Sequence, residues 1–173
     1  MPRRNTRKAK NDYDKIEHHH LLLRMETTVC PGPNDKDKAE TLIQNIIHDI
    51  GMNLLDKPHV YYVKIPRYNE GLTAIAPIQT SHIAFHFWKN PDPKILRNAK
   101  SKCLLEFDIY TCGKMTINNI KHIMHHLTVF NPTHADITLL NRKWSLTVDR
   151  HMKWDGTESL PWTKWLDSER FNT

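Results

Sequence analysis

The stretch from residue 79 to 88, which reads QTSHIAFHFW, places the strongest constraint on the fold. Apolar side chains occupy the odd-numbered positions from 83 to 87, and both histidines occupy even-numbered positions. Successive residues of a strand point to opposite faces of its sheet, so this pattern predicts a strand with one face in the core. Strict alternation of side chains along the strand would place Ser81 and His86 on opposite faces of the sheet. A bend where the strand begins would let the Ser81 hydroxyl turn toward His86.

Hydrophobic periodicity divides the rest of the chain into strands and helices. Apolar residues recur at helical spacing from Ala39 to Ile50, before a stop at Gly51, and again after a capping Thr116. Runs rich in β-branched and aromatic residues predict strands over 18–29, 59–65, 72–78, 79–88, 103–113, 135–140 and 144–148. The order β-α-β-β-β-β-α-β-β predicts the α+β class, as a two-layer sandwich of an antiparallel β-sheet with the helices on one face.

The chain has 173 residues and a formal net charge of +6, of which residues 1–15 contribute +4. We expect a disordered basic tail over 1–15, a folded domain over 16–150 and a Trp-rich C-terminal arm over 151–173. Solvated disorder is the usual state of such a tail, and we expect no nucleic-acid partner. No apolar run reaches the roughly 20 residues of a membrane helix, so we expect a cytoplasmic protein without a membrane partner.

The three cysteines, Cys30, Cys103 and Cys112, form neither an even set nor a CxxC pair. At least one thiol must be free in a monomer, and we expect Cys30 and Cys103 to be small core residues. His122 and His126 stand four residues apart on the second predicted helix, a spacing that zinc sites use. No acidic general base accompanies them, so we interpret them as part of a half-exposed helix face and expect no metal.

Three segments, in this order, carry a family resemblance. They are residues 70–76 (EGLTAIA), 80–88 (TSHIAFHFW) and 107–113 (FDIYTCG). Together they resemble the pyruvoyl-dependent S-adenosylmethionine decarboxylases of the short bacterial and archaeal type. The early segment HLLL at 20–23 also resembles the first strand of that family. The resemblance extends over about residues 18–148 and implies the fold of that family.

The resemblance implies self-processing chemistry. It implies that Ser81 attacks the carbonyl of Thr80, that the chain is cut between these two residues, and that Ser81 becomes a pyruvoyl cofactor. The family histidine matched by His86 removes the serine Cα proton, and the hydroxyl matched by Thr73 stabilises the tetrahedral intermediate. Cys112 matches the cysteine that returns a proton to the substrate carbon after CO2 leaves, a role that requires a free thiol.

The sequence departs from the family pattern beside these motifs. Thr80 stands where the family has glutamate, and Lys89 and Asn90 stand where it has proline and glutamate. Extra residues also separate the matched histidine from the matched cysteine. Because S-adenosylmethionine is a cation, the missing carboxylates leave the substrate open. We expect substrate contacts from one carboxylate and three aromatic side chains: Asp92, Tyr68, Phe85 and Trp88.

The resulting hypothesis is a pyruvoyl-dependent decarboxylase that converts S-adenosylmethionine to S-adenosylmethioninamine and CO2 for spermidine biosynthesis. Two alternatives stay open: the same cofactor acting on ornithine or arginine, and an unprocessed homologue that acts as a binding or regulatory subunit. Helices on one face of the sheet leave the other face uncovered. We expect a second copy of the chain to cover it in a homodimer.

Overall fold

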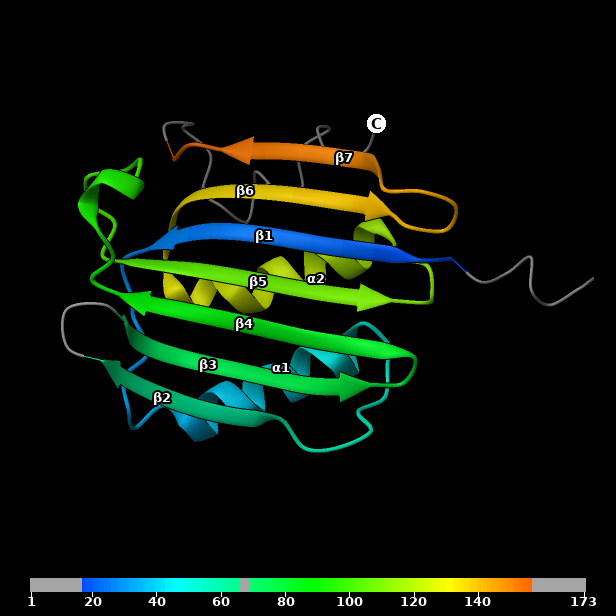
Figure 1. The fold of residues 1–173 in the computed structure, drawn as a ribbon, viewed down its shortest axis with the longest axis horizontal. Coiled ribbons are helices and arrows are strands. Elements are labelled where there is room, and N and C mark those ends of the chain that lie inside the picture. Colours follow the sequence, from blue (N-terminus) through cyan, green and yellow to red (C-terminus); the bar gives the residue numbers. More distant parts are fainter. Residues whose placement is uncertain (1–16, 66–68, 157–173) are drawn as a thin grey trace, which may run out of the picture.

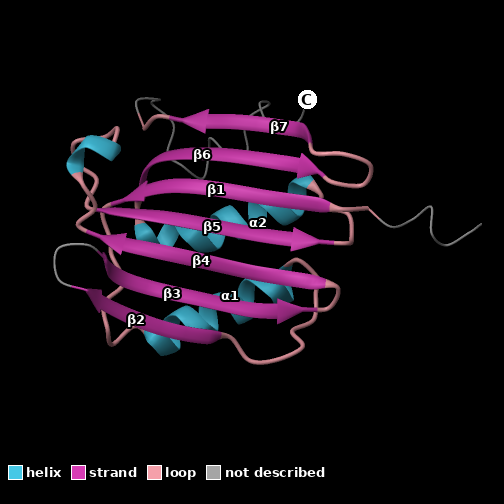
Figure 2. Cartoon of the chain, viewed as in Figure 1, coloured by secondary structure: helices cyan, strands magenta, loops and turns pink. Residues whose placement is uncertain are grey.

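The computed structural model describes residues 17–65 and 69–156. Within them, seven strands form one antiparallel sheet in the order β2-β3-β4-β5-β1-β6-β7. Helices α1 and α2 lie against one face of this sheet and leave the other, the open face, without a helix (Figure 1; Figure 2). The elements are β1 (His19–Thr27), α1 (Lys36–Asp49), β2 (His59–Ile65), β3 (Asn69–Ile78), β4 (Ser81–Lys89), η2 (Pro93–Ile95), β5 (Cys103–Thr111), α2 (Ile117–Leu127), η3 (Thr128–Phe130), β6 (Pro132–Asn141) and β7 (Thr147–Trp154).

The order of strands and helices confirms the α+β sandwich predicted from the sequence. The largest difference is the last strand, predicted over 144–148 and observed as β7. Trp144 and Leu146 give the predicted segment its apolar character, but they are 89% and 74% exposed in the connection before β7. Trp154 ends β7 and is buried, so the predicted C-terminal arm begins inside this strand.

Other parts of the predicted domain division lie outside the described residues. These parts are the basic tail over 1–15 and the arm beyond residue 156, which includes Trp162 and Trp165. Among the helices that the structure describes, none is long and apolar enough to cross a membrane.

The core lies between the helices and the sheet face that they cover. On β4 this face carries Ile83, Phe85 and Phe87, which are at most 3% exposed. The helices contribute Ala39, Ile43, Ile46 and Ile47 from α1 and Ile120, Ile123, Met124 and Leu127 from α2. Each fully buried isoleucine or leucine contributes about 1.5–3 kcal/mol. Thr116 caps α2 as predicted, because its hydroxyl accepts a hydrogen bond from the backbone of Asn119.

A disulfide joins Cys30 to Cys103, with the two Cα atoms 5.8 Å apart. Cys103 is a buried core residue as predicted and Cys30 packs against the core, but the disulfide between them was not predicted. In the pairing of β1 with β5, Thr27 lies opposite Cys103, which brings the chain at Cys30 to the neighbouring strand. The two cysteines are 73 residues apart in the sequence, so their spacing carried no signal of this contact. Cys112 is a free thiol.

We expect reduction of this disulfide to lower the free energy of unfolding of the uncleaved chain by about 2–4 kcal/mol, because it closes a long loop in the unfolded state of that chain. Urea unfolding with and without a reductant measures the difference. Cys30→Ser should abolish the effect of the reductant, and Cys112→Ser should leave that effect unchanged. Equal stability of the wild-type chain under both conditions contradicts the prediction.

The connection between β4 and β5, residues 90–102, is anchored on the carboxylate of Glu26. Glu26 belongs to the open-face side of β1, yet it is fully buried. Its carboxylate accepts hydrogen bonds from the backbone of Arg97 and Asn98, at 2.8 and 3.0 Å, and from the Ser101 hydroxyl at 2.9 Å. Burial alone raises the pKa of Glu26, but these hydrogen bonds outweigh it, so the pKa lies below its ordinary value.

We expect Glu26→Gln to lower the free energy of unfolding by about 1.5–3 kcal/mol at neutral pH, because a neutral amide is a weaker acceptor for several donors. The difference should be complete above pH 4.5, the ordinary value of the carboxyl, and should be lost as the pH falls through the lower folded-state pKa. Urea unfolding at a series of pH values measures it. Glu106→Gln, on an exposed position of β5, is the matched control. A difference that does not change with pH contradicts this account.

Candidate active site

The hairpin between β3 and β4 turns through two residues, Gln79 and Thr80, with Ile78 paired to Ser81 across the turn. Thr80 has a φ of 72°, in the left-handed region. A β-branched residue is rare in that region, because its side chain is crowded by the backbone, and such strain costs about 1–3 kcal/mol. The peptide bond between Thr80 and Ser81 is therefore held at a strained corner.

Two side chains with reactive groups lie at this corner. The Cys112 thiol donates a hydrogen bond to the carbonyl oxygen of Thr80 over 3.2 Å. The Ser81 hydroxyl oxygen is buried and has no hydrogen-bond partner among the described residues. A cavity of about 650 Å3 opens beside them, with Asn53 and Lys114 in its lining as well as Thr80 and Cys112. A nucleophile, a carbonyl carbon and a proton donor therefore lie together.

Thr73 and His86 form a second polar pair, on the open face of the sheet. They lie opposite each other on β3 and β4, and Thr73 Oγ1 is 2.8 Å from His86 Nδ1. His86 is exposed, whereas Ser81 shares the side of β4 that carries the buried Ile83. Five residues of strand separate Ser81 from His86 by about 16 Å. A bend that turns Ser81 toward His86 of the same chain is therefore absent, because alternation holds from the first residue of β4.

A family model described as S-adenosylmethionine decarboxylase matches residues 20–143. The chain belongs to the S-adenosylmethionine decarboxylase family. This result confirms the predicted resemblance, and the matched region contains both the Ser81–Cys112 corner and the Thr73–His86 pair. A comparison with individually curated proteins gave no match.

The substrate-contacting residues predicted for this S-adenosylmethionine decarboxylase family member lie apart from one another. Trp88 is on the open face, with its ring centroid 5.6 Å from that of His86. Phe85 is 1% exposed and faces the helices, so it is a core residue. Asp92 caps η2 by accepting a backbone hydrogen bond of 2.9 Å. Tyr68 lies outside the described residues. Of the candidates that are described, Trp88 lies beside a predicted catalytic side chain.

Glu70 begins the first of the three family segments, residues 70–76, and its carboxylate already has two partners. The ammonium of Lys89, at a position where the family has proline, lies 3.4 Å from the Glu70 carboxylate. The Tyr62 hydroxyl donates a hydrogen bond to it over 2.7 Å. Burial, together with this hydrogen bond, raises the pKa of Tyr62 to about 12. Glu70 is therefore engaged within the chain and is a poor replacement for the carboxylates that the family has beside the site.

A cluster of polar side chains on the open face lies beside the Cys112 end of β5, and the sequence analysis assigned it no role. The imidazoles of His20 and His82 approach one carboxylate oxygen of Asp108, at 3.5 and 3.1 Å. The ring of Tyr110 lies 5.8 and 6.1 Å from those two imidazoles. Each of these residues alternates with core residues on its own strand, and that pattern was the available signal. These side chains meet because β4, β5 and β1 are neighbours in the sheet, and this strand order cannot be read from the sequence.

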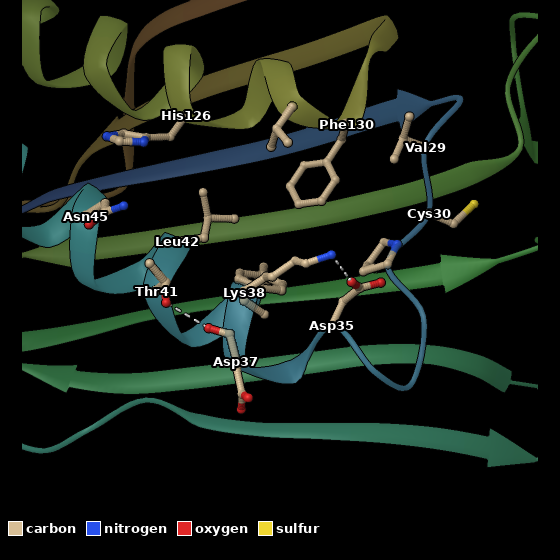
Figure 3. Close-up of a pocket in the computed structure, with 14 residues that line it drawn as sticks. Val29, Cys30, Asp35, Asp37, Lys38, Thr41, Leu42, Asn45, His126 and Phe130 are labelled. Carbon is tan, nitrogen blue, oxygen red and sulfur yellow. Dashed lines mark hydrogen bonds and ion pairs between the residues drawn. The ribbon is translucent and has the colours of Figure 1, made fainter.

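A second cavity, of about 610 Å3, lies between the two helices (Figure 3). Its lining is largely apolar, with Leu42, Val129 and Phe130 among its residues, and it shares no lining residue with the cavity beside Thr80. His126 lies at its edge and forms a 2.7 Å hydrogen bond with Asp49. In residues 17–65 and 69–156, no group of three or more His, Cys, Asp and Glu side chains is arranged to hold a metal. We therefore place the candidate active site at the Thr80–Ser81 corner.

Proposed function

We propose that the chain is a self-processing, pyruvoyl-dependent decarboxylase that is cleaved between Thr80 and Ser81. The main support for this proposal is the arrangement of side chains around that peptide bond. Cys112 donates to the Thr80 carbonyl oxygen over 3.2 Å, and the buried Ser81 hydroxyl beside it has no partner among the described residues. A buried polar group without a hydrogen-bond partner generally lowers stability by about 1–3 kcal/mol. A serine that is kept in such a position despite this cost is a candidate for a chemical role.

Cleavage begins when the Ser81 oxygen adds to the carbonyl carbon of Thr80. A C–O bond forms, the C–N bond to Ser81 breaks, and the hydroxyl proton ends on the freed amine, which gives an ester. Negative charge gathers on the Thr80 oxygen during this step, and the Cys112 thiol is already hydrogen-bonded to that oxygen. The left-handed conformation of Thr80 favours the reaction, because breaking the bond releases its strain. A histidine, His86 in this proposal, then removes the Ser81 Cα proton, the Cβ–O bond breaks, and the chain is cut with a carboxylate on Thr80. Water then replaces the amine of residue 81, which leaves as ammonia, to give the ketone of the pyruvoyl group.

The pyruvoyl group made from Ser81 would supply a ketone that holds the substrate amine and accepts the electrons released with CO2. A proton must then reach the substrate carbon. Cys112 suits this task, because it is a free thiol at the same corner of the fold. Its position supports two roles, as a donor to the Thr80 oxygen before cleavage and as the proton donor to the substrate afterwards.

We propose that two copies of the chain form a homodimer through their open faces. This face exposes large apolar side chains that a second sheet would bury: Leu22, Tyr61, Ile75 and Val148. It also carries the Thr73–His86 pair, about 16 Å along β4 from Ser81 of the same chain. The Ser81 side chain lies on the helix side of β4, and the shift from peptide to ester breaks its backbone C–N bond, which frees its Cα to turn to the open face. In a two-fold dimer the strands of the second sheet can run back over the first, so that each Thr73–His86 pair meets the freed Ser81 Cα of the other subunit. The catalytic site would then be complete only in the dimer.

The proposed substrate is S-adenosylmethionine, and the proposed products are S-adenosylmethioninamine and CO2, for spermidine biosynthesis in the cytoplasm. Membership of the family supports this substrate. Ornithine and arginine are the alternatives, because Thr80 and Asn90 stand where the family has glutamates. Release of CO2 from each of the three compounds by the cleaved protein tests the choice. Release from S-adenosylmethionine alone excludes the alternatives, and release from ornithine or arginine alone excludes S-adenosylmethionine.

The second candidate function is that of an unprocessed binding or regulatory subunit. It is favoured by the separation of Ser81 from His86 on the two sides of β4 within one chain. A denaturing gel run with a reductant, which opens the Cys30–Cys103 disulfide between the two fragments, distinguishes the two functions. Fragments 1–80 and 81–173 support the decarboxylase, and a chain that stays whole after long incubation supports the second candidate.

A further inference from the structure

Tyr110 and His18 lie near Cys112 at the same end of the sheet, where β5 borders β4 on one side and β1 on the other. Tyr110 precedes Cys112 by two residues, so both side chains belong to the same side of β5 and its extension. The pairing of His19 with Thr111 places His18 next to this end of β5. His18 Nδ1 lies 2.7 Å from the Tyr110 hydroxyl oxygen. The residues matched by the family model begin at residue 20, so His18 lies before them.

The surroundings of Tyr110 hold its ring in one position. The guanidinium of Arg142 lies over the ring, with Cζ 4.4 Å from the centroid. The backbone nitrogen of Arg142 donates to the carbonyl oxygen of His18 over 2.6 Å, which ties the ends of β1 and β6 together. The Tyr110 hydroxyl is therefore held against the His18 imidazole, on the side of β5 and its extension that Cys112 shares.

We infer that His18, Tyr110 and Cys112 form a chain of hydrogen-bond donors that ends on the scissile carbonyl of Thr80. In this chain the His18 ring N–H donates to the Tyr110 oxygen, the Tyr110 hydroxyl donates to the Cys112 sulfur, and the Cys112 thiol donates to the Thr80 oxygen. His18 and Tyr110 are positioning residues, since they act through the thiol. The expected effect of these donors, faster self-cleavage, rests on the proposed function.

The pKa of Tyr110 agrees with its place in this series of hydrogen-bond donors. Burial, and then the negative charge of the Cys112 thiolate and its hydrogen bond, raise the pKa of Tyr110, although Arg142 opposes the shift. Tyr110 therefore stays protonated at neutral pH and remains a donor. A donor at the sulfur also steadies the thiolate that forms whenever Cys112 gives up its proton.

The first test is read on uncleaved protein, so it does not depend on the proposed function. Ser81→Ala keeps the chain whole, and the disulfide leaves Cys112 as the one free thiol among the three cysteines. In this background, Tyr110→Phe should slow alkylation of Cys112 by iodoacetamide at neutral pH by roughly threefold to fivefold. Loss of a hydrogen bond to the charged sulfur should cost about tenfold, and the higher intrinsic nucleophilicity of a sulfur without that donor offsets part of the loss.

The sign of the effect separates this role from a merely structural one. A looser chain end would expose the thiol and speed its alkylation, whereas loss of the donor slows it. His18→Leu should act in the same direction, and the double variant should be no slower than Tyr110→Phe, because the two residues act in series. Tyr62→Phe, on β2, is the matched control and should leave the rate unchanged. An alkylation rate for Tyr110→Phe equal to or faster than that of its parent overturns the inference.

The second test is the rate of self-cleavage in chains that keep Ser81. Tyr110→Phe should slow cleavage by about tenfold. This effect is smaller than the rate loss that follows removal of a donor bonded directly to the oxyanion. Cleavage as fast as in the wild-type chain overturns the stated consequence of the donor chain. If the wild-type chain never cleaves, the proposed function fails, and the alkylation test still decides whether the donor chain exists.

Discussion

Replacing Ser81 with alanine should leave the chain whole on a reducing, denaturing gel, whereas the wild-type chain should give fragments 1–80 and 81–173. Alanine removes the oxygen that adds to the Thr80 carbonyl and keeps the pairing of residue 81 with Ile78. Decarboxylation by the Ser81→Ala chain should fall to the uncatalysed rate, because the proposed cofactor is made from the serine side chain. This is the largest effect that we expect from any single substitution.

Stability and a second serine provide the controls for this result. The Ser81→Ala chain should be as stable as the uncleaved wild-type chain or more so, because a buried hydroxyl without a described partner is removed. Ser145→Ala, in the exposed connection before β7, should cleave at the wild-type rate. Cleavage of the Ser81→Ala chain at the same bond contradicts the proposed chemistry.

Mixing two inactive variants restores cleavage in one of them. Ser81→Ala and His86→Ala chains should each stay whole alone, because one lacks the nucleophile and the other lacks the base. In a mixed dimer, Ser81 of the His86→Ala chain meets His86 of the other subunit. About half of the His86→Ala chains should therefore be cut after random assembly, since each chain pairs equally with either partner.

A tag on the His86→Ala chain identifies which chain is cut, and denaturing gels of the separate and mixed proteins measure the fraction. A chain that carries both substitutions is the matched control, because it should not rescue His86→Ala. If the mixture stays whole although mixed dimers form, each site is built within one subunit and the proposed dimer is wrong. The same experiment then requires a different explanation for the 16 Å separation, which is about five residues of strand.

The sequence predicted the sheet and both helices, because their signals are local. The apolar stripe from Ala39 to Ile50 and the alternation from residue 83 to 87 report burial on one side of a single element. The observed α1 and β4 bury those residues. The last strand was misplaced because Trp144 and Leu146 are apolar but exposed, so hydrophobicity alone did not report burial there.

The sequence could not predict contacts that depend on strand order. Cys30 meets Cys103, and His18 meets Tyr110, because β1 lies next to β5 although 75 residues separate the end of one from the start of the other. Motif matching brought Ser81, His86, Thr73 and Cys112 into one family pattern. It did not show that Ser81 and Cys112 lie at one corner while Thr73 and His86 lie on the open face, since that division follows from the register of the strands.

The measurement that tests the account most directly is the intact mass of the purified wild-type protein under denaturing, reducing conditions. The account predicts two species, with masses of residues 1–80 and 81–173, and the second should be lighter by one ammonia than a fragment with serine at its N-terminus. That deficit is the signature of a pyruvoyl group made from Ser81. A single species with the mass of the full, unmodified chain contradicts the account.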